Sequence, residues 1–128
     1  MELDEKALNI INGKNFGFIA TVSKDGYPHV TPLWVDTDGE NLIINTSKGR
    51  KKLRNLERDS RVAVAVQNHE NPYNYVLVIG KVSNITENGA VEHIDKLAKK
   101  YRGLDQYPGP RVDRVMVIIK PERVFYQG

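Results

Sequence analysis

The residues that could do chemistry in this chain are gathered in one segment, between Leu42 and Arg61. Its apolar run Leu42–Ile44 ends in amide and hydroxyl side chains, which are followed by a glycine and by a cluster of Lys and Arg. From Lys48 to Arg61 there are seven Lys or Arg against two acids, whereas the whole chain carries a formal charge of only +3. Positive charge beside hydroxyls, at the start of a helical pattern, is typical of a site for a phosphate or another anion.

The composition is that of one globular domain. The chain has 128 residues, of which 40% are hydrophobic, and that is enough for a core without disulfides or metal clips. No run of eighteen apolar residues is present and residues 1–14 resemble an amphipathic helix rather than an apolar leader, so we expect a cytoplasmic protein without membrane contact. Cysteine is absent, which excludes thiol catalysis and cysteine-ligated metals. The histidines show no metal-ligand spacing, so we expect no metal site: His29, His69 and His93.

Helical spacing of apolar residues occurs in three places. It predicts an amphipathic helix over residues 3–11 and another over 91–101. Between them, Ser47 is the expected N-cap of a short helix that turns Leu53 and Leu56 inward.

Seven segments have the periodicity of β-strands: residues 16–23, 27–36, 40–46, 61–68, 73–86, 113–120 and 122–127. Asp-Gly turns join the first three, so we expect these to be consecutive antiparallel neighbours. Arg61–Val66 and Val115–Ile119 are apolar on both faces, so both faces of the sheet must be covered. We therefore expect a mainly β protein, a small antiparallel barrel whose outer faces pack against helices and a second copy of the chain.

Several segments, taken in their order along the chain, resemble one protein family. They are Pro28–Val35, Gly49–Lys52, Arg54–Leu56, Asn71–Val76 and Pro121–Val124. Together they resemble the pyridoxamine 5′-phosphate oxidase-like family of flavin- and deazaflavin-dependent split-barrel oxidoreductases, over nearly the whole chain. The resemblance points to the small branch associated with the deazaflavin coenzyme F-420. The pyridoxal-phosphate-binding C-terminal segment of the true oxidases has no counterpart after Tyr126, so we do not expect pyridoxamine oxidase activity.

The resemblance implies a fold and an assembly. The fold is an antiparallel split β-barrel of six to seven strands, the FMN-binding split-barrel type, formed by a single domain over residues 1–128. The assembly is a homodimer that binds a flavin-type cofactor, FMN or F-420, in a groove shared by the two subunits.

For the cofactor's phosphate, the resemblance implies Arg50 and Lys52, with Lys51 nearby. A guanidinium, an ammonium and free helix N-terminal amides are the groups that a phosphate dianion prefers. The alternative is a solvated helix face, which is the ordinary interpretation of an isolated basic run, but the position after a polar strand end favours binding. We expect Arg54 and Arg58 to face water.

For the tricyclic ring, the resemblance implies the strand that carries Thr31, Pro32, Leu33 and Trp34. A proline within a strand pattern indicates an edge or an irregularity, which suits a backbone bent toward a ligand. The alternative for Trp34 is packing in the core or at the dimer contact.

Four further residues are candidate cofactor ligands. Asn45 and Thr46 are expected at the amide-like edge of the ring or the ribityl hydroxyls, and Ser47 adds a hydroxyl beside the basic cluster; the alternative is strand-end and capping chemistry. Tyr73 shares a strand face with Tyr75, so both are expected to stack over a cofactor held by the partner subunit or to pack the interface.

The implied activity is hydride transfer between the cofactor and a small electrophilic substrate, and no catalytic side chain is expected because the cofactor carries the chemistry. Lys48 and Lys51 favour F-420 over FMN, because the deazaflavin has an acidic glutamate tail. One alternative is a flavin- or haem-binding protein without turnover. The other is a basic nucleic-acid module, against which stands the lack of aromatic residues interleaved with the basic ones.

Overall fold

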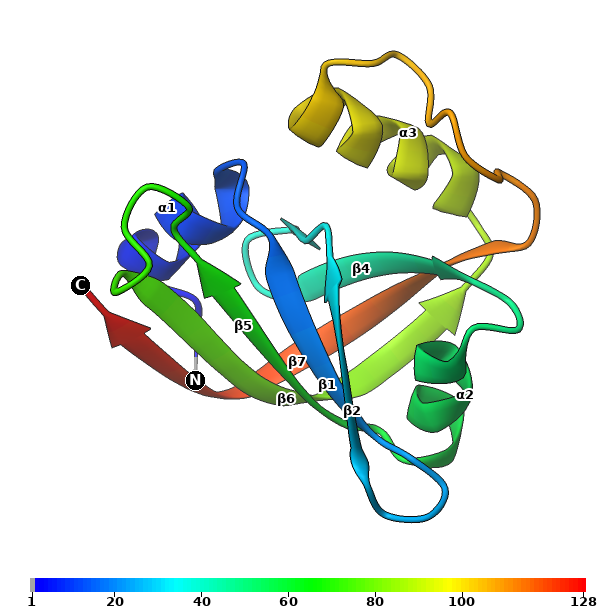
Figure 1. Cartoon of the computed structure of the whole chain (residues 1–128), viewed down its shortest axis with the longest axis horizontal. Helices are drawn as coiled ribbons and strands as arrows, with labels where there is room; N and C mark the ends of the chain where they lie inside the picture. The colour runs from blue at the N-terminus through cyan, green and yellow to red at the C-terminus, as the bar shows by residue number, and fades with distance from the viewer. Residues whose placement is uncertain (1) are drawn as a thin grey trace.

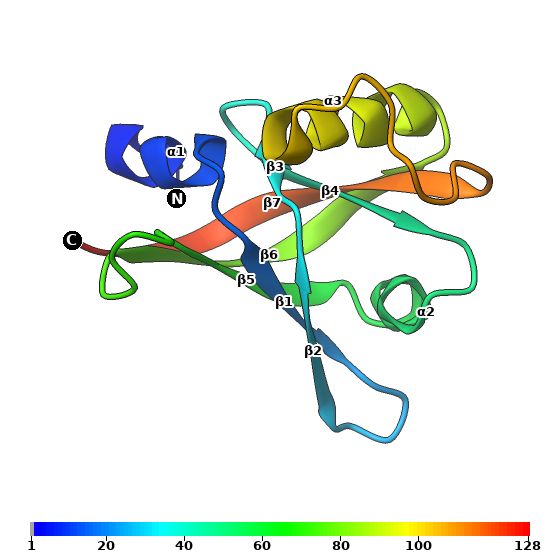
Figure 2. The ribbon, with the colours of Figure 1, turned by 45° about the horizontal axis from the view of Figure 1, so that its top comes forward.

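The computed structural model describes residues 2–128, which form one seven-stranded sheet with three helices around it (Figures 1 and 2). The strands are β1 (Gly17–Val22), β2 (Pro28–Leu33), β3 (Asp36–Thr37), β4 (Leu42–Ser47), β5 (Arg61–Gln67), β6 (Tyr75–Thr86) and β7 (Arg114–Gln127). The helices are α1 (Glu5–Asn12), α2 (Lys51–Arg58) and α3 (Ala90–Arg102). Every pairing is antiparallel. The expected mainly β, antiparallel fold is therefore confirmed, with seven strands.

The order of the strands shows why the sheet must curl. The order is β2-β1-β5-β6-β7-β4-β3, so that β2 and β3 lie at opposite edges. Only Trp34 and Val35 separate these two edge strands in the sequence, and the three residue steps from Leu33 to Asp36 span at most about 11 Å. The two edges must therefore approach each other, and the sheet forms a split barrel, as the short passage from β2 to β3 in Figure 2 shows.

The barrel is filled by side chains that alternate along each strand. Val62, Val64 and Val66 of β5 are buried, and so are Val115, Val117 and Ile119 of β7, with the intervening residues turned outward. One end of this core is covered by α1, which buries Ala7, Ile10 and Ile11, and α2 adds Leu53 and Leu56. The third helix, α3, packs on β4 and β7.

The first helix begins and ends as its residues predict. The side chain of Asp4 accepts a hydrogen bond from the N–H of Ala7 at 2.9 Å, which caps the helix. The N–H of Gly13 donates to the carbonyl of Ile10 at the other end. The helical pattern predicted over residues 1–14 thus becomes Glu5–Asn12, and Met1 lies outside the described residues.

The strand predicted over residues 27–36 is confirmed over Pro28–Leu33, but it is not continuous, because β2 ends at Leu33 and β3 begins at Asp36. The side chains of α3 explain the break. The hydroxyl of Tyr101 accepts from the N–H of Val35 at 3.1 Å, and the ammonium of Lys100 donates to the carbonyl of Val35 at 2.9 Å. With its backbone groups taken, Val35 cannot join a ladder. The antiparallel pairings expected at the two Asp-Gly turns are confirmed, but the three segments do not form one meander, since β2 pairs with β1 whereas β4 pairs with β3 and β7.

Ser47 is not the N-cap of α2. It is the last residue of β4, where it pairs with Arg114, and Arg50 occupies the cap position without a side-chain hydrogen bond. The chain turns at Gly49, whose φ of +89° is the left-handed conformation that glycine adopts without strain.

The two closing strands predicted at residues 113–120 and 122–127 are one strand, β7. Pro121 lies inside it, opposite Gly80 of β6, at a register shift in the ladder. A side chain at position 80 would collide with the carbonyl of Lys120. The glycine thus allows the two backbones to meet closely enough for the strand to continue through the proline.

Candidate functional site

Three cations converge where α2 begins beside the first residue of β7. Burial lowers the pKa of Lys52, and the neighbouring Arg50 and Arg114 lower it further. Burial also lowers the pKa of Arg114, and Arg50 adds to that effect. These shifts mean that like charges are held close together and partly out of water.

No acid neutralises this cluster of Arg50, Lys52 and Arg114. Among residues 2–128, neither Arg50 nor Lys52 has an ion pair or a side-chain hydrogen bond, and Arg114 has no carboxylate partner. The neighbouring α2 has no side-chain cap at its N-terminus. Unpaired cations and uncapped helix amides are the groups that a doubly charged anion such as a phosphate prefers.

The structure gives Asn45 a role other than the one expected. Its side chain is 9% exposed, its oxygen accepts from Nε of Arg114 at 2.8 Å, and its nitrogen donates to the carbonyl of Ala90 at 2.8 Å. These bonds leave the amide committed to the protein, so Asn45 supports Arg114. Thr46 is buried beside it and Ser47 is half-buried.

On β2, Thr31 and Leu33 are half-buried whereas Pro32 is exposed, as expected for alternate residues of an edge strand. The hydroxyl oxygen of Thr31 and Nδ1 of His29 share the half-buried face, and both are buried without a hydrogen-bond partner among residues 2–128. Native proteins seldom leave such atoms unpaired unless a ligand or water meets them. The polar face of β2 therefore fits the polar edge of a ligand.

Trp34 has the packing role that the sequence raised as its alternative. It is stacked on Tyr101, with ring centres 5.3 Å apart and planes 6° apart, and it meets the edge of Tyr107 at 5.8 Å. The ring of Tyr107 also lies 5.3 Å from the guanidinium of Arg114. This aromatic group joins the β2 side of the site to the cation cluster.

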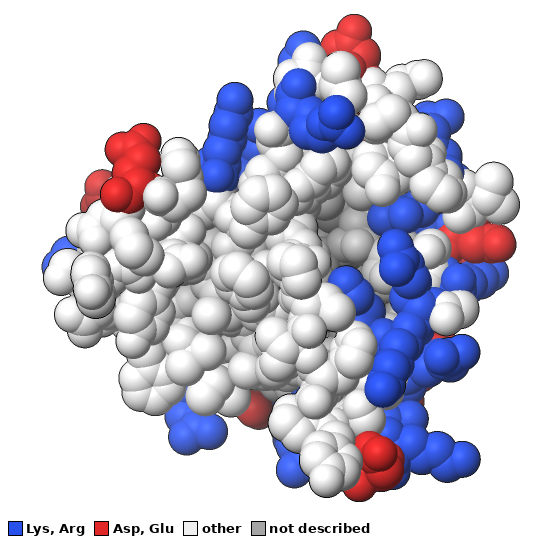
Figure 3. Space-filling model, viewed as in Figure 1, with Lys and Arg blue, Asp and Glu red and all other residues white. Residues whose placement is uncertain are grey.

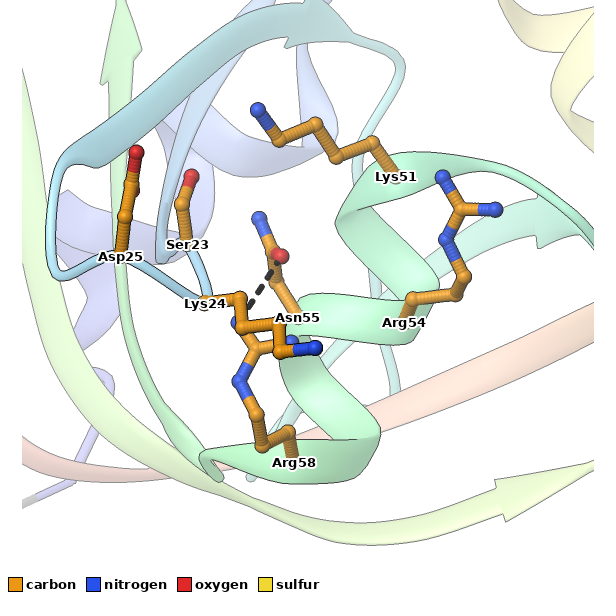
Figure 4. Close-up of a pocket in the computed structure, with 7 residues that line it drawn as sticks. All are labelled: Ser23, Lys24, Asp25, Lys51, Arg54, Asn55 and Arg58. Carbon is orange, nitrogen blue, oxygen red and sulfur yellow. Dashed lines mark hydrogen bonds between the residues drawn. The ribbon is translucent and has the colours of Figure 1, made fainter.

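A second basic region adjoins the first. An open cavity of about 780 Å³ separates the β1–β2 hairpin from α2 (Figure 4) and is lined by Ser23, Lys24, Asp25, Lys51, Arg54, Asn55 and Arg58. In Figure 4, Lys51 extends from α2 toward the hairpin. On the surface, Lys and Arg side chains gather along one side of a hollow, next to a broad uncharged area (Figure 3).

Two residues of α2 at this cavity make hydrogen bonds within the protein. Arg58 is exposed, but it donates to the carbonyl of Val22 at 2.8 Å and to the side chain of Asn55 at 3.1 Å, so it is not simply solvated. Asn55 is only 2% exposed and also donates to Thr21 at 3.0 Å. Arg54 is exposed, as expected.

Tyr73 does not lie near the other candidate site residues. It is 82% exposed and precedes β6, in the loop between β5 and β6, which lies on the opposite side of the molecule from α2 (Figure 1). Conversely, no sequence pattern pointed to Arg114 as a site residue. The signal that could have found it is the pairing of β4 with β7, which places Arg114 opposite Ser47.

The strand order and pairing described above define the class of protein as an antiparallel split barrel. The chain belongs to the pyridoxamine 5′-phosphate oxidase family, whose sequence pattern matches residues 3–128.

Solved structures agree with this assignment. A protein described as an F420 reductase is 32% identical, with a TM-score of 0.84 over 91% of this chain and 94% of the other. The conserved hypothetical protein Rv2991 from Mycobacterium tuberculosis is 24% identical, with a TM-score of 0.75 over 97% of this chain and 84% of the other. General Stress Protein 26 from Bacillus anthracis is 24% identical, with a TM-score of 0.74 over 99% of this chain and 95% of the other.

No helix between residues 2 and 128 is both long and apolar enough to cross a membrane. Within the same range, no group of three or more His, Asp or Glu side chains could hold a metal ion.

Proposed function

We propose that the protein is an oxidoreductase that binds F-420 or FMN, with the cofactor's phosphate at Arg50, Lys52 and Arg114. The observation that carries this proposal is the convergence of these cations without an acidic partner. A bound phosphate would relieve their mutual repulsion and accept hydrogen bonds from the first amides of α2. Membership of the family and the likeness to an F420 reductase support a flavin-type group over other phosphates.

The ring of the cofactor would lie along β2, and the unpartnered atoms of that strand support this placement. The hydroxyl of Thr31 and Nδ1 of His29 would meet the polar edge of the ring, which would satisfy them. Leu33 would supply an apolar contact beside the aromatic pair Trp34 and Tyr101. The bound cofactor supplies hydride transfer, and the residues of this chain anchor, orient and keep water away. The substrate that this chemistry suits is a small electrophile.

We also propose that the functional unit is a homodimer in the cytoplasm. The strand registers place Pro32, Phe18, Ala65, Leu77 and Phe125 in one row across five strands on the outer face of the sheet. Phe18 is 40% exposed and Phe125 is 50% exposed, an arrangement that favours coverage by a second copy. Tyr73 could then reach only a cofactor of the partner.

Between the two cofactors, the proposal favours F-420. Of the two lysines that suggested an acidic tail, Lys48 is paired with Glu87 at 2.9 Å, which weakens its contribution. Lys51, however, is unpaired and shares the 780 Å³ cavity with Lys24 and Arg54. Such a cavity suits the carboxylates of a glutamate tail.

Titration of the purified protein with F-420, FMN and haem, followed by absorption, tests the proposal. We expect saturable binding of F-420 or FMN and, with the reduced cofactor, turnover of small electrophiles. Tight cofactor binding without turnover would instead support a non-enzymatic carrier, and haem binding alone would refute the flavin site.

A further inference from the structure

A chain of buried polar groups leads from β3 to the cation cluster. Asp36 accepts from Nε2 of His93 at 3.0 Å, and Nδ1 of His93 lies 3.0 Å from the side-chain nitrogen of Asn45. The oxygen of Asn45 accepts from Nε of Arg114 at 2.8 Å. The side chains of His93 and Asp36 are only 6% and 8% exposed. Four side chains from β3, α3, β4 and β7 are thus connected without water.

The chemistry of its neighbours allows Asn45 only one orientation. A guanidinium has donors and no acceptor, so the amide must turn its oxygen to Arg114. The carbonyl of Ala90 is an acceptor, so the amide nitrogen must face it at 2.8 Å. Both neighbours therefore demand the same arrangement, in which the second N–H of Asn45 points at Nδ1 of His93.

That arrangement fixes the proton on His93. Because Nδ1 receives an N–H from Asn45, it must be unprotonated, and the proton lies on Nε2 toward Asp36. Asp36 also accepts from Lys96 at 3.1 Å and from the backbone of Thr37 at 2.8 Å. Burial alone would raise the pKa of Asp36, but the hydrogen bonds from His93, Thr37 and Lys96 lower it to about 2. Asp36 is therefore a carboxylate throughout the pH range in which histidine side chains titrate.

We propose that Asn45 and His93 are positioning residues that hold Arg114 for the anion, and that this support requires neutral His93. A proton on Nδ1 would face the N–H of Asn45, donor against donor. Turning the amide would relieve that clash but would present its NH₂ group to Arg114, which again pairs donors. Protonation of His93 therefore releases Arg114 and weakens anion binding. The inference rests on the proposed anion site, whichever cofactor occupies it.

Charge alone predicts that a bound anion would favour protonation of His93, which is opposite to the effect that we propose. The two cases can therefore be distinguished by experiment. The charged groups near His93 are Asp36 from β3, Arg114 from β7, and Lys96 and Lys100 from α3 itself. If only charge mattered, a bound phosphate dianion would favour protonated His93. If His93 holds Arg114 through Asn45, ligand binding must favour neutral His93, by reciprocity between the two equilibria.

NMR titration of the histidine side chains in the intact wild-type protein distinguishes these cases. The titration is followed without ligand and with saturating F-420, FMN or inorganic phosphate. We expect the neutral ring of His93 to carry its proton on Nε2 and not on Nδ1, and we expect ligand to move the midpoint of its titration to lower pH. Tenfold weaker binding to the protonated form would move it by about one pH unit. A midpoint that rises or stays in place on ligand binding overturns the inference.

Two substitutions of the same residue give a matched comparison. In His93→Asn, the amide oxygen can occupy the place of Nδ1 and accept from Asn45 without titrating. In His93→Gln, the amide reaches Asp36 but leaves Asn45 unsupported. We expect the Asn variant to bind phosphate as the wild type does at pH 8 and more tightly than the wild type at pH 5.5, whereas the Gln variant binds several-fold more weakly at both. Ionisation of the phosphate itself changes its affinity equally for all three proteins, so it does not affect the comparison between them.

The outcomes also separate this inference from the proposed function. If inorganic phosphate binds but F-420 and FMN do not, the proposed function is wrong and the His93 titration with phosphate still decides the inference. If no anion binds at low salt, both are wrong. If a cofactor binds and the Asn variant loses affinity as the Gln variant does, His93 is only structural.

Discussion

Replacement of Arg114 by Met separates binding from stability most sharply. The variant keeps most of the side chain's length but removes one of three like charges and the donor to Asn45. A charge-assisted hydrogen bond to a phosphate contributes about 1.5–3 kcal/mol, so the dissociation constant of the cofactor should rise about 10- to 150-fold. Stability of the free protein should change little, because relief of repulsion with Arg50 and Lys52 offsets the lost hydrogen bond and the contact with Tyr107.

The assay is a fluorescence titration with FMN or F-420 beside urea unfolding of the same samples. Arg61→Met is the matched control, because Arg61 is 70% exposed and paired with Asp59 outside the cluster, so its affinity should equal that of the wild type. In Arg114→Met, NMR should also find the pKa of Lys52 raised toward its ordinary value. Unchanged affinity in Arg114→Met would place the phosphate elsewhere and refute the reasoning.

Four other predictions concern separate parts of the account. Thr31→Val removes a buried unpartnered hydroxyl, so it should stabilise the free protein by about 1 kcal/mol in urea unfolding and yet weaken cofactor binding; a loss of stability would mean that the hydroxyl is already satisfied. Asp36 has its pKa lowered to about 2, so its stabilising effect should be complete above the unfolded value near 4 and disappear as the pH falls toward 2. The stability difference between wild type and Asp36→Asn, about 2 kcal/mol at pH 5, should therefore shrink steeply below pH 4 to a small remainder at pH 2, and a constant difference would contradict this. Sedimentation at micromolar concentration should give a dimer, whereas a 14.5 kDa species would argue against the proposed interface. Random oligonucleotides should bind weakly and be released near physiological salt; salt-resistant binding without cofactor binding would favour a nucleic-acid module.

Local pattern was enough to predict most of the strands and the basic cluster of α2, because both depend on neighbouring residues. The break at Val35 could not be predicted, since it is caused by Lys100 and Tyr101, about 65 residues away in the sequence. A strand pattern records which side chains are apolar, and it does not record where the backbone groups find their partners.

The candidate site also contains residues that the sequence could indicate and residues whose role depends on the fold. Arg50 and Lys52 lie two positions apart in the sequence, so the basic cluster could be recognised there. Arg114 comes close to them only through the pairing of β4 with β7. Asn45 was visible as a polar residue at a strand end, but its role depends on Ala90, His93 and Arg114, which belong to other elements. Sequence spacing can suggest which groups bind an anion, and the fold determines which groups hold them in place.

The proposed function requires that a phosphate anchor the cofactor at Arg50, Lys52 and Arg114. A comparison of FMN with riboflavin, which lacks the phosphate, tests this requirement, and F-420 can be compared in the same way with its phosphate-free deazaflavin. We expect saturable binding of the phosphorylated form and at least about tenfold weaker binding of the form without phosphate. Equal affinity for the two forms, or no binding of either phosphorylated cofactor, would contradict it.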